Sequence, residues 1–121
     1  MIKLTCLLKR KEGTTPAEFH AYWRDNHGPL IVNSSAARYV IRYVQNPRPL
    51  DSYRGDDDRS GYDGVTEQWF ESMEAYNAHM GEDDFPAMWE DITKFLDLDH
   101  LDMVLTEEPR VVIDGGVDWS G

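Results

Sequence analysis

The sequence lacks the features of secreted and membrane-inserted proteins. Cys6 is the single cysteine among 121 residues, which excludes an internal disulfide. No apolar run approaches 18 residues, and the N-terminal MIKLTCLLKRK does not have the basic-then-apolar order of a signal peptide. We therefore expect a cytoplasmic protein with no membrane partner.

Basic residues are also scarce. Twelve lysines and arginines stand against 23 acidic residues, which gives a formal net charge of −11. A nucleic-acid-binding surface neutralises phosphates with clustered lysine and arginine, and few are available here. The composition therefore argues against nucleic acid as a partner.

The common cofactor and metal motifs are missing as well. The chain has no glycine-rich phosphate loop, no nucleophile elbow, no Cys-X-X-Cys and no histidine pair at zinc spacing. Residues 56–67 match part of a calcium-loop template, but prolines precede the match and a strand follows it. We expect no metal and no cofactor. A haem-binding protein stays open as an alternative, because one histidine suffices as a haem ligand.

What the sequence does contain is one globular domain, which we place at residues 1–113, followed by a flexible tail at 114–121. The length suits a single core, and 40% of the residues are hydrophobic. The tail is rich in glycine and polar residues.

The most informative stretch is TPAEFHAYWRDNHGPLIVNSSA, residues 15–36. Thr15 and Glu18 form the pattern of a capping box, so a helix is expected to begin here. Helical spacing places an aromatic stripe on one face, ending at His27. Gly28 is expected to end this helix in a left-handed conformation, with a second short helical turn after Pro29.

The remaining segments complete a β-α-β-β-α-β order. Strands are predicted at residues 2–8, 38–45, 64–71 and within 101–112; helical segments are predicted at 72–80 and from about 83 onward. This order predicts an α+β fold of the ferredoxin-like type, with a four-stranded antiparallel sheet and both helices on one face. The polar connection at 47–63 is either a mobile lid or a solvated loop without a role.

Three of the predicted strands carry apolar residues on both faces. Leu7 stands beside Leu8, Val40 beside Ile41 and Val104 beside Leu105. Helices can cover one sheet face, so we expect a second copy to cover the other and form a homodimer.

In these features the chain resembles EthD-like proteins of the dimeric α+β-barrel superfamily. The matching residues lie in order along nearly the whole chain: Phe19, Tyr22-Trp23, His27-Gly28-Pro29, Tyr39, Tyr62-Asp63-Gly64, Glu67, Trp69-Phe70, Ser72, Glu74, Asp84-Phe85, Phe95-Leu96-Asp97 and Glu107-Glu108. The resemblance implies a pocket between the sheet and the helices of each subunit, with His27 as its chemical group. It also implies several activities, among them cofactor-free cyclases, dehydratases and isomerases, haem-dependent monooxygenases, and accessory proteins of oxidative pathways.

Three residues are candidates for catalysis. His27 could be a general base, or a structural histidine that closes its helix. Glu67 lies between Val65 and Trp69 on one face of its strand, where it is buried or directed at a substrate; an exposed glutamate at the sheet edge is the alternative. Tyr39 could donate a proton, although tyrosines on strands usually serve packing.

Further residues are expected to bind substrate, chiefly through aromatic side chains: Phe19, Trp23, Tyr43, Trp69, Phe85 and Trp89. His79 could face the same pocket, although its place next to Gly81 favours exposure. The sequence thus predicts a cofactor-free lyase, cyclase or isomerase acting on a hydrophobic aromatic or polyketide-like molecule. A binding protein without chemistry of its own is the alternative, and a haem-dependent monooxygenase is a more remote one.

Overall fold

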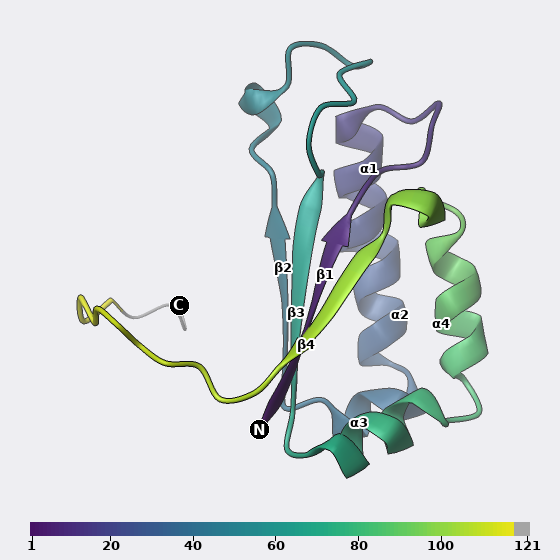
Figure 1. Cartoon of the computed structure of the whole chain (residues 1–121). Helices are drawn as coiled ribbons and strands as arrows, with labels where there is room; N and C mark the ends of the chain where they lie inside the picture. The colour runs from purple at the N-terminus through teal and green to yellow at the C-terminus, as the bar shows by residue number, and fades with distance from the viewer. Residues whose placement is uncertain (118–121) are drawn as a thin grey trace.

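The computed structural model describes residues 1–117 and has the expected order of elements (Figure 1). In chain order these are β1 (Ile2–Leu8), α1 (Pro16–Tyr22), the π-helical turn η1 (Trp23–His27), α2 (Gly28–Val32), the 3₁₀ turn η2 (Ser35–Tyr39), β2 (Arg42–Pro47), η3 (Leu50–Ser52), β3 (Gly64–Phe70), α3 (Met73–Met80), α4 (Phe85–Ile92), η4 (Leu98–His100) and β4 (Asp102–Thr106).

The four strands form one antiparallel sheet in the order β2-β3-β1-β4. The helices lie together against one face of this sheet, as Figure 1 shows. The ferredoxin-like α+β fold predicted from the sequence is therefore confirmed. Because side chains alternate along a strand, each strand sends one set of residues toward the helices and the other set to the uncovered face.

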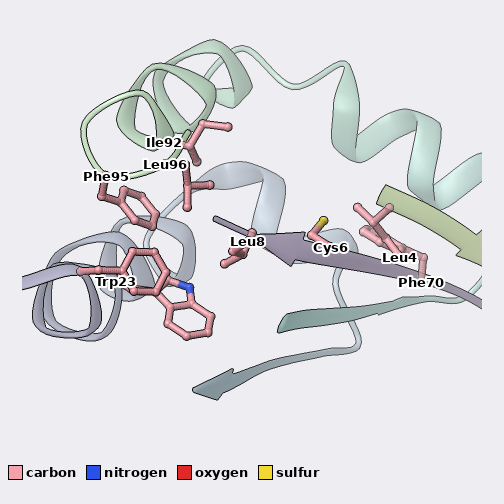
Figure 2. Packing of buried hydrophobic residues seen from close by; sticks show 9 residues of the cluster. Leu4, Cys6, Leu8, Trp23, Phe70, Ile92, Phe95 and Leu96 are labelled. Atoms are coloured by element: carbon pink, nitrogen blue, oxygen red, sulfur yellow. The ribbon is translucent and has the colours of Figure 1, made fainter. Parts of the chain in front are cut away.

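The core forms where β1 meets the helices. Leu4, Cys6 and Leu8 alternate along β1 and are all buried. Trp23, Phe95 and Leu96, together with other residues of the helical layer, pack over them (Figure 2). Burial of such large apolar side chains stabilises a domain by about 1.5–3 kcal/mol each, so this layer holds the helices on the sheet.

The first helical segment begins as the sequence predicts. The Thr15 Oγ1 accepts from the Glu18 amide at 3.1 Å, and the Glu18 carboxylate accepts from the Thr15 amide at 2.9 Å. The predicted left-handed ending at Gly28 is wrong, because Gly28 has φ −55° and the helix continues through it. The break is instead the π-helical turn η1, in which the Gly28 amide donates to the Trp23 carbonyl.

Contact with the sheet explains this π-helical turn. Gln45 on β2 donates its Nε2 hydrogen to the same Trp23 carbonyl at 3.1 Å. A Cβ atom at position 28 would lie 3.3 Å from that Gln45 nitrogen, so glycine is favoured there by the close approach. The turn ends at His27 and leaves its ring buried.

The second strand begins later than predicted. Residues 38–41 are rich in β-branched and aromatic side chains, yet β2 starts at Arg42 and Tyr39 closes η2. Tertiary contacts override the local propensity here: the Asp84 carboxylate accepts from both the amide and the hydroxyl of Ser35, which fixes the preceding turn. Tyr39 consequently stands on a 3₁₀ turn and not in a strand.

A buried ion pair and several hydrogen bonds tie the loop at 48–63 to the body of the domain, and its role as a mobile lid stays a prediction. Arg10 is 1% exposed and forms an ion pair with the equally buried Asp63 at 3.0 Å. The same guanidinium donates to the carbonyls of Asp56 and Asp58. The loop lies at one end of the sheet, beyond the start of β3 (Figure 1).

One carboxylate of the partial calcium template, that of Asp58, is engaged by protein groups. The Asp58 carboxylate accepts from the amides of Arg54 and Ser60. Among residues 1–117, no three histidine, cysteine or acidic side chains come close enough together to hold a metal ion.

Residues 107–117 follow β4 as an exposed segment that leaves the body of the domain (Figure 1). The predicted tail at 114–121 falls partly on residues 118–121, which lie outside the described chain. Over residues 1–117, no helix has the length and apolar character needed to cross a membrane.

Candidate functional site

A cavity of about 210 Å³ lies between the inner face of the sheet and the helices. Its lining comes from both layers and is largely apolar; the polar or ionisable members include Cys6, His27, Tyr43, Thr66, Gln68, Tyr76 and His79. Pockets for drug-sized ligands usually measure about 300–1,000 Å³, so this cavity suits a compact molecule.

His27 lines this cavity, and its Nδ1 nitrogen contacts a buried carboxylate. Its Nδ1 lies 2.8 Å from Oδ2 of Asp91 on α4, and both residues are buried, at 6% and 7% exposed. Oδ1 of Asp91 accepts from the Tyr22 hydroxyl at 2.6 Å and lies 3.6 Å from Lys94 Nζ. The carboxylate is thus held on both oxygens, which fixes the imidazole that it contacts.

This arrangement determines which ring nitrogen is free. A proton on Nδ1 is shared with Asp91, so the Nε2 nitrogen carries a lone pair in the neutral ring. Among residues 1–117 no protein group forms a hydrogen bond to Nε2. A neutral imidazole with an unoccupied lone pair at an apolar cavity can accept a proton from a bound molecule.

Burial and the Asp91 contact act in opposite directions on these groups. Burial lowers the pKa of His27 below its ordinary 6.5, and outweighs the hydrogen bond and charge of Asp91, which raise it. For Asp91 burial raises the pKa, but the hydrogen bonds from Tyr22 and His27, together with nearby positive charge, outweigh it, so the pKa is lowered. At neutral pH the pair is a neutral imidazole beside an ionised carboxylate.

The cavity also contains a hydrogen-bond donor on the sheet. Tyr43 on β2 lines it, and its hydroxyl oxygen accepts from Gln45 Nε2 at 3.3 Å. Burial raises the pKa of Tyr43, so the phenol keeps its proton. Its O–H is therefore available to donate to a ligand oxygen.

His79 is buried, in contrast to the exposed position that its neighbour Gly81 suggested. It is 5% exposed and lines the cavity from α3. Its Nδ1 lies 2.9 Å from the Ala36 carbonyl oxygen. The cavity therefore has two imidazoles, from different helical segments.

The other sequence candidates divide into three groups: residues that line the cavity, one that packs in the core, and three on other surfaces. Trp23, Phe85 and Trp89 line the cavity with Tyr43. Phe19 is 1% exposed but packs in the core behind Trp23, at a ring-centroid distance of 5.5 Å.

Three candidates lie away from the cavity. Glu67 and Trp69 alternate with the inward Thr66 and Gln68, and so lie on the uncovered face of the sheet. Glu67 forms an ion pair with Lys3 at 3.1 Å, and the Lys3 ammonium lies 5.4 Å from the Trp69 ring centroid. The Tyr39 hydroxyl accepts from Arg38, on the turn before β2.

Sequence reasoning missed Asp91. It follows Met88 by three positions and precedes Ile92, so it borders the apolar stripe of α4. A carboxylate beside an apolar stripe is a signal for a buried partner, but its pairing with His27 spans 64 positions and depends on the fold.

A family profile for the EthD domain matches residues 11–99. The chain belongs to the EthD family. The resemblance seen in the sequence is therefore confirmed. None of the curated proteins matches the chain.

Solved structures show the same fold. An EthD family protein from Bacillus halodurans C-125 is 19% identical, with a TM-score of 0.67 over 90% of this chain and 99% of its own. SnoaB from Streptomyces nogalater, described as a cofactor-independent oxygenase, is 11% identical, with a TM-score of 0.61 over 93% and 97%. A dimeric protein of ferredoxin-like fold from Bacteroides fragilis is 8% identical, with a TM-score of 0.62 over 88% and 95%.

Proposed function

We propose that this EthD protein is a cofactor-free enzyme that removes a proton from a carbon next to a carbonyl group in a hydrophobic small molecule. The observation that carries the proposal is the His27–Asp91 contact of 2.8 Å at the wall of an apolar cavity. An aromatic or polyketide-like substrate suits the aromatic walls formed by Trp23, Phe85 and Trp89.

The chemistry follows from the positions of the groups. Nε2 of His27 takes the proton, and the electron pair of the broken C–H bond moves onto the carbonyl oxygen to give an enolate. Asp91 stabilises the imidazolium that forms, and the Tyr43 hydroxyl can donate to the enolate oxygen. Apolar surroundings strengthen both interactions because they exclude water.

The enolate can continue in several ways. Return of the proton to a different carbon is isomerisation, expulsion of a β-hydroxyl as water is dehydration, and attack on a second carbonyl is cyclisation. Reaction of the carbanion with molecular oxygen is a further candidate, supported by the likeness to SnoaB, which is described as a cofactor-independent oxygenase. All of these begin with the same proton transfer.

We also propose that the protein is a homodimer joined through the uncovered sheet face. Apolar residues on that face include Leu7, Val44, Val65 and Val104. Val104 is 53% exposed in the single chain, and the helices cover the opposite face (Figure 1). A stable interface buries about 1,200–2,000 Å² in total, which pairing of two sheets can supply. The Bacteroides fragilis protein of the same fold is described as dimeric, which supports a dimeric state.

The experiment begins with a ligand screen. Trp23 lines the cavity, so quenching of tryptophan fluorescence reports binding of aromatic ketones such as 2-tetralone. Bound ketones are then incubated in D₂O, and loss of the α-proton signal is followed by NMR. Exchange faster than in protein-free buffer supports the enzyme, and binding without faster exchange supports the accessory protein instead.

A second incubation separates the fates of the enolate. Product formed equally with and without dissolved oxygen indicates isomerisation, dehydration or cyclisation. Product that requires oxygen indicates the oxygenase reaction.

A further inference from the structure

The cavity holds a second imidazole, that of His79, which the proposed proton transfer does not use. Its Nδ1 lies 2.9 Å from the Ala36 carbonyl oxygen, and the contact is buried. A carbonyl oxygen has no proton to give, so Nδ1 must carry the hydrogen. In the neutral ring this leaves Nε2 with a lone pair.

Two aromatic rings hold this imidazole in place. Phe70 lies 5.1 Å from it between ring centroids, and Phe85 lies 5.7 Å from it with the two planes at 79°. Phe70 is fully buried, so the ring has little freedom to turn. Among residues 1–117, the Ala36 carbonyl is the hydrogen-bond partner of His79, and Nε2 has none.

The groups that contact Nδ1 differ between the two imidazoles, and this difference gives the two histidines different roles. His27 has a carboxylate at Nδ1, which stabilises the cation formed when Nε2 takes a proton. His79 has a neutral carbonyl there, which gives much less stabilisation to a cation. His79 is therefore suited to accept a hydrogen bond and poorly suited to take the proton itself.

We propose that His79 determines specificity by accepting a hydrogen bond from a hydroxyl group of the substrate. The proposal rests on the proposed function and narrows its substrate to hydroxylated cyclic or aromatic ketones. The carbonyl and its acidic C–H lie at His27 and Tyr43, and a hydroxyl elsewhere on the molecule reaches His79 Nε2. A ligand that lacks this donor leaves the buried nitrogen without a partner, which weakens binding.

Matched pairs of ligands test the proposal directly. Each of 5-, 6- and 7-hydroxy-2-tetralone is compared with its methyl ether by tryptophan quenching. The ether keeps the oxygen and the ring but cannot donate. For at least one position we expect the hydroxy compound to bind about tenfold more tightly, the size expected of one hydrogen bond to a buried acceptor.

Two variants separate this role from a structural one. In His79→Asn the side-chain amide can still donate to the Ala36 carbonyl, but no acceptor reaches the position of Nε2. In His79→Gln the side-chain carbonyl can reach that position, while the contact with Ala36 is lost. We expect the hydroxyl preference to vanish in His79→Asn and to persist at least in part in His79→Gln, with both proteins compared at a temperature where they are folded.

The outcomes are distinct. Equal affinity of the unaltered protein for both members of every pair, including no measurable binding, overturns the proposal, as does an unchanged preference in folded His79→Asn. Faster α-proton exchange without a hydroxyl preference leaves the function of His27 intact and removes that of His79. A hydroxyl preference without faster exchange supports the role of His79 and removes the proposed role of His27.

Discussion

The loop at 48–63 should depend on one buried charge pair, which the variant Asp63→Asn tests. Asp63 accepts from the Arg10 amide at 2.7 Å, from Arg10 Nη1 at 3.0 Å and from the Tyr53 hydroxyl at 2.8 Å. Asparagine has nearly the same shape but no charge, and its amino group cannot accept. The variant therefore leaves the Arg10 guanidinium buried without a counter-charge.

The expected cost can be worked out from the contacts. Removal of one partner of a buried ion pair usually costs about 3–5 kcal/mol. Arg10 keeps its hydrogen bonds to the carbonyls of Thr14, Asp56 and Asp58, which partly compensate its charge. We therefore expect a loss near the lower end, about 3 kcal/mol of unfolding free energy.

Urea denaturation followed by tryptophan fluorescence measures this loss. Asp57→Asn is the matched control, because Asp57 lies in the same loop, is exposed and makes no ion pair among residues 1–117. Trypsin should also cleave Asp63→Asn faster after Arg54 and Arg59, whose loop is released. A loss below about 1 kcal/mol with unchanged cleavage would refute the view that this pair anchors the loop.

Three further predictions concern the packing, the titration and the assembly of the protein. Gly64→Ala should destabilise the fold by about 1–3 kcal/mol in urea denaturation, because the new Cβ would lie 2.6 Å from Trp23 Cζ3. Gly81→Ala is the control, since the atom nearest to its new Cβ would be 3.5 Å away. The pKa of His20 and of His27 is lowered in the folded protein, so the unfolded chain binds more protons just below pH 6.5. The melting temperature should therefore fall as the pH drops through that range, and a melting temperature that rises there would contradict this. Light scattering should give twice the chain mass of 14.0 kDa, and Val104→Asp should reduce it to the single-chain value; a monomer at micromolar concentration would refute the sheet-to-sheet dimer.

Local sequence patterns predicted most of the elements. The alternation along β1 and the capping box of α1 depend on neighbouring residues, and the structure has both where they were expected. Strand alternation also separated Glu67 and Trp69 from Thr66 and Gln68, but the sequence could not tell which set faces the helices.

Features that depend on distant contacts were not accessible from the sequence. The start of β2 is shifted by the contact of Asp84 with Ser35, across 49 positions. The buried contacts that tie the 48–63 loop to the domain come from Arg10, which the sequence places in a basic turn like a surface residue. Asp91 became a site residue only when the fold placed α4 beside His27, and the burial of His79 at the cavity, which its nearness to Gly81 argued against, likewise depends on the fold.

The central claim is that His27, supported by Asp91, takes a proton from the substrate. The most direct measurement is α-proton exchange of 2-tetralone in D₂O, with unaltered protein, His27→Ala and Asp91→Asn compared at equal folded concentration. We expect the protein-dependent rate to fall by about 10²–10⁴-fold in His27→Ala with ligand affinity nearly unchanged, and to fall in Asp91→Asn as well. Full exchange activity in folded His27→Ala would contradict the claim.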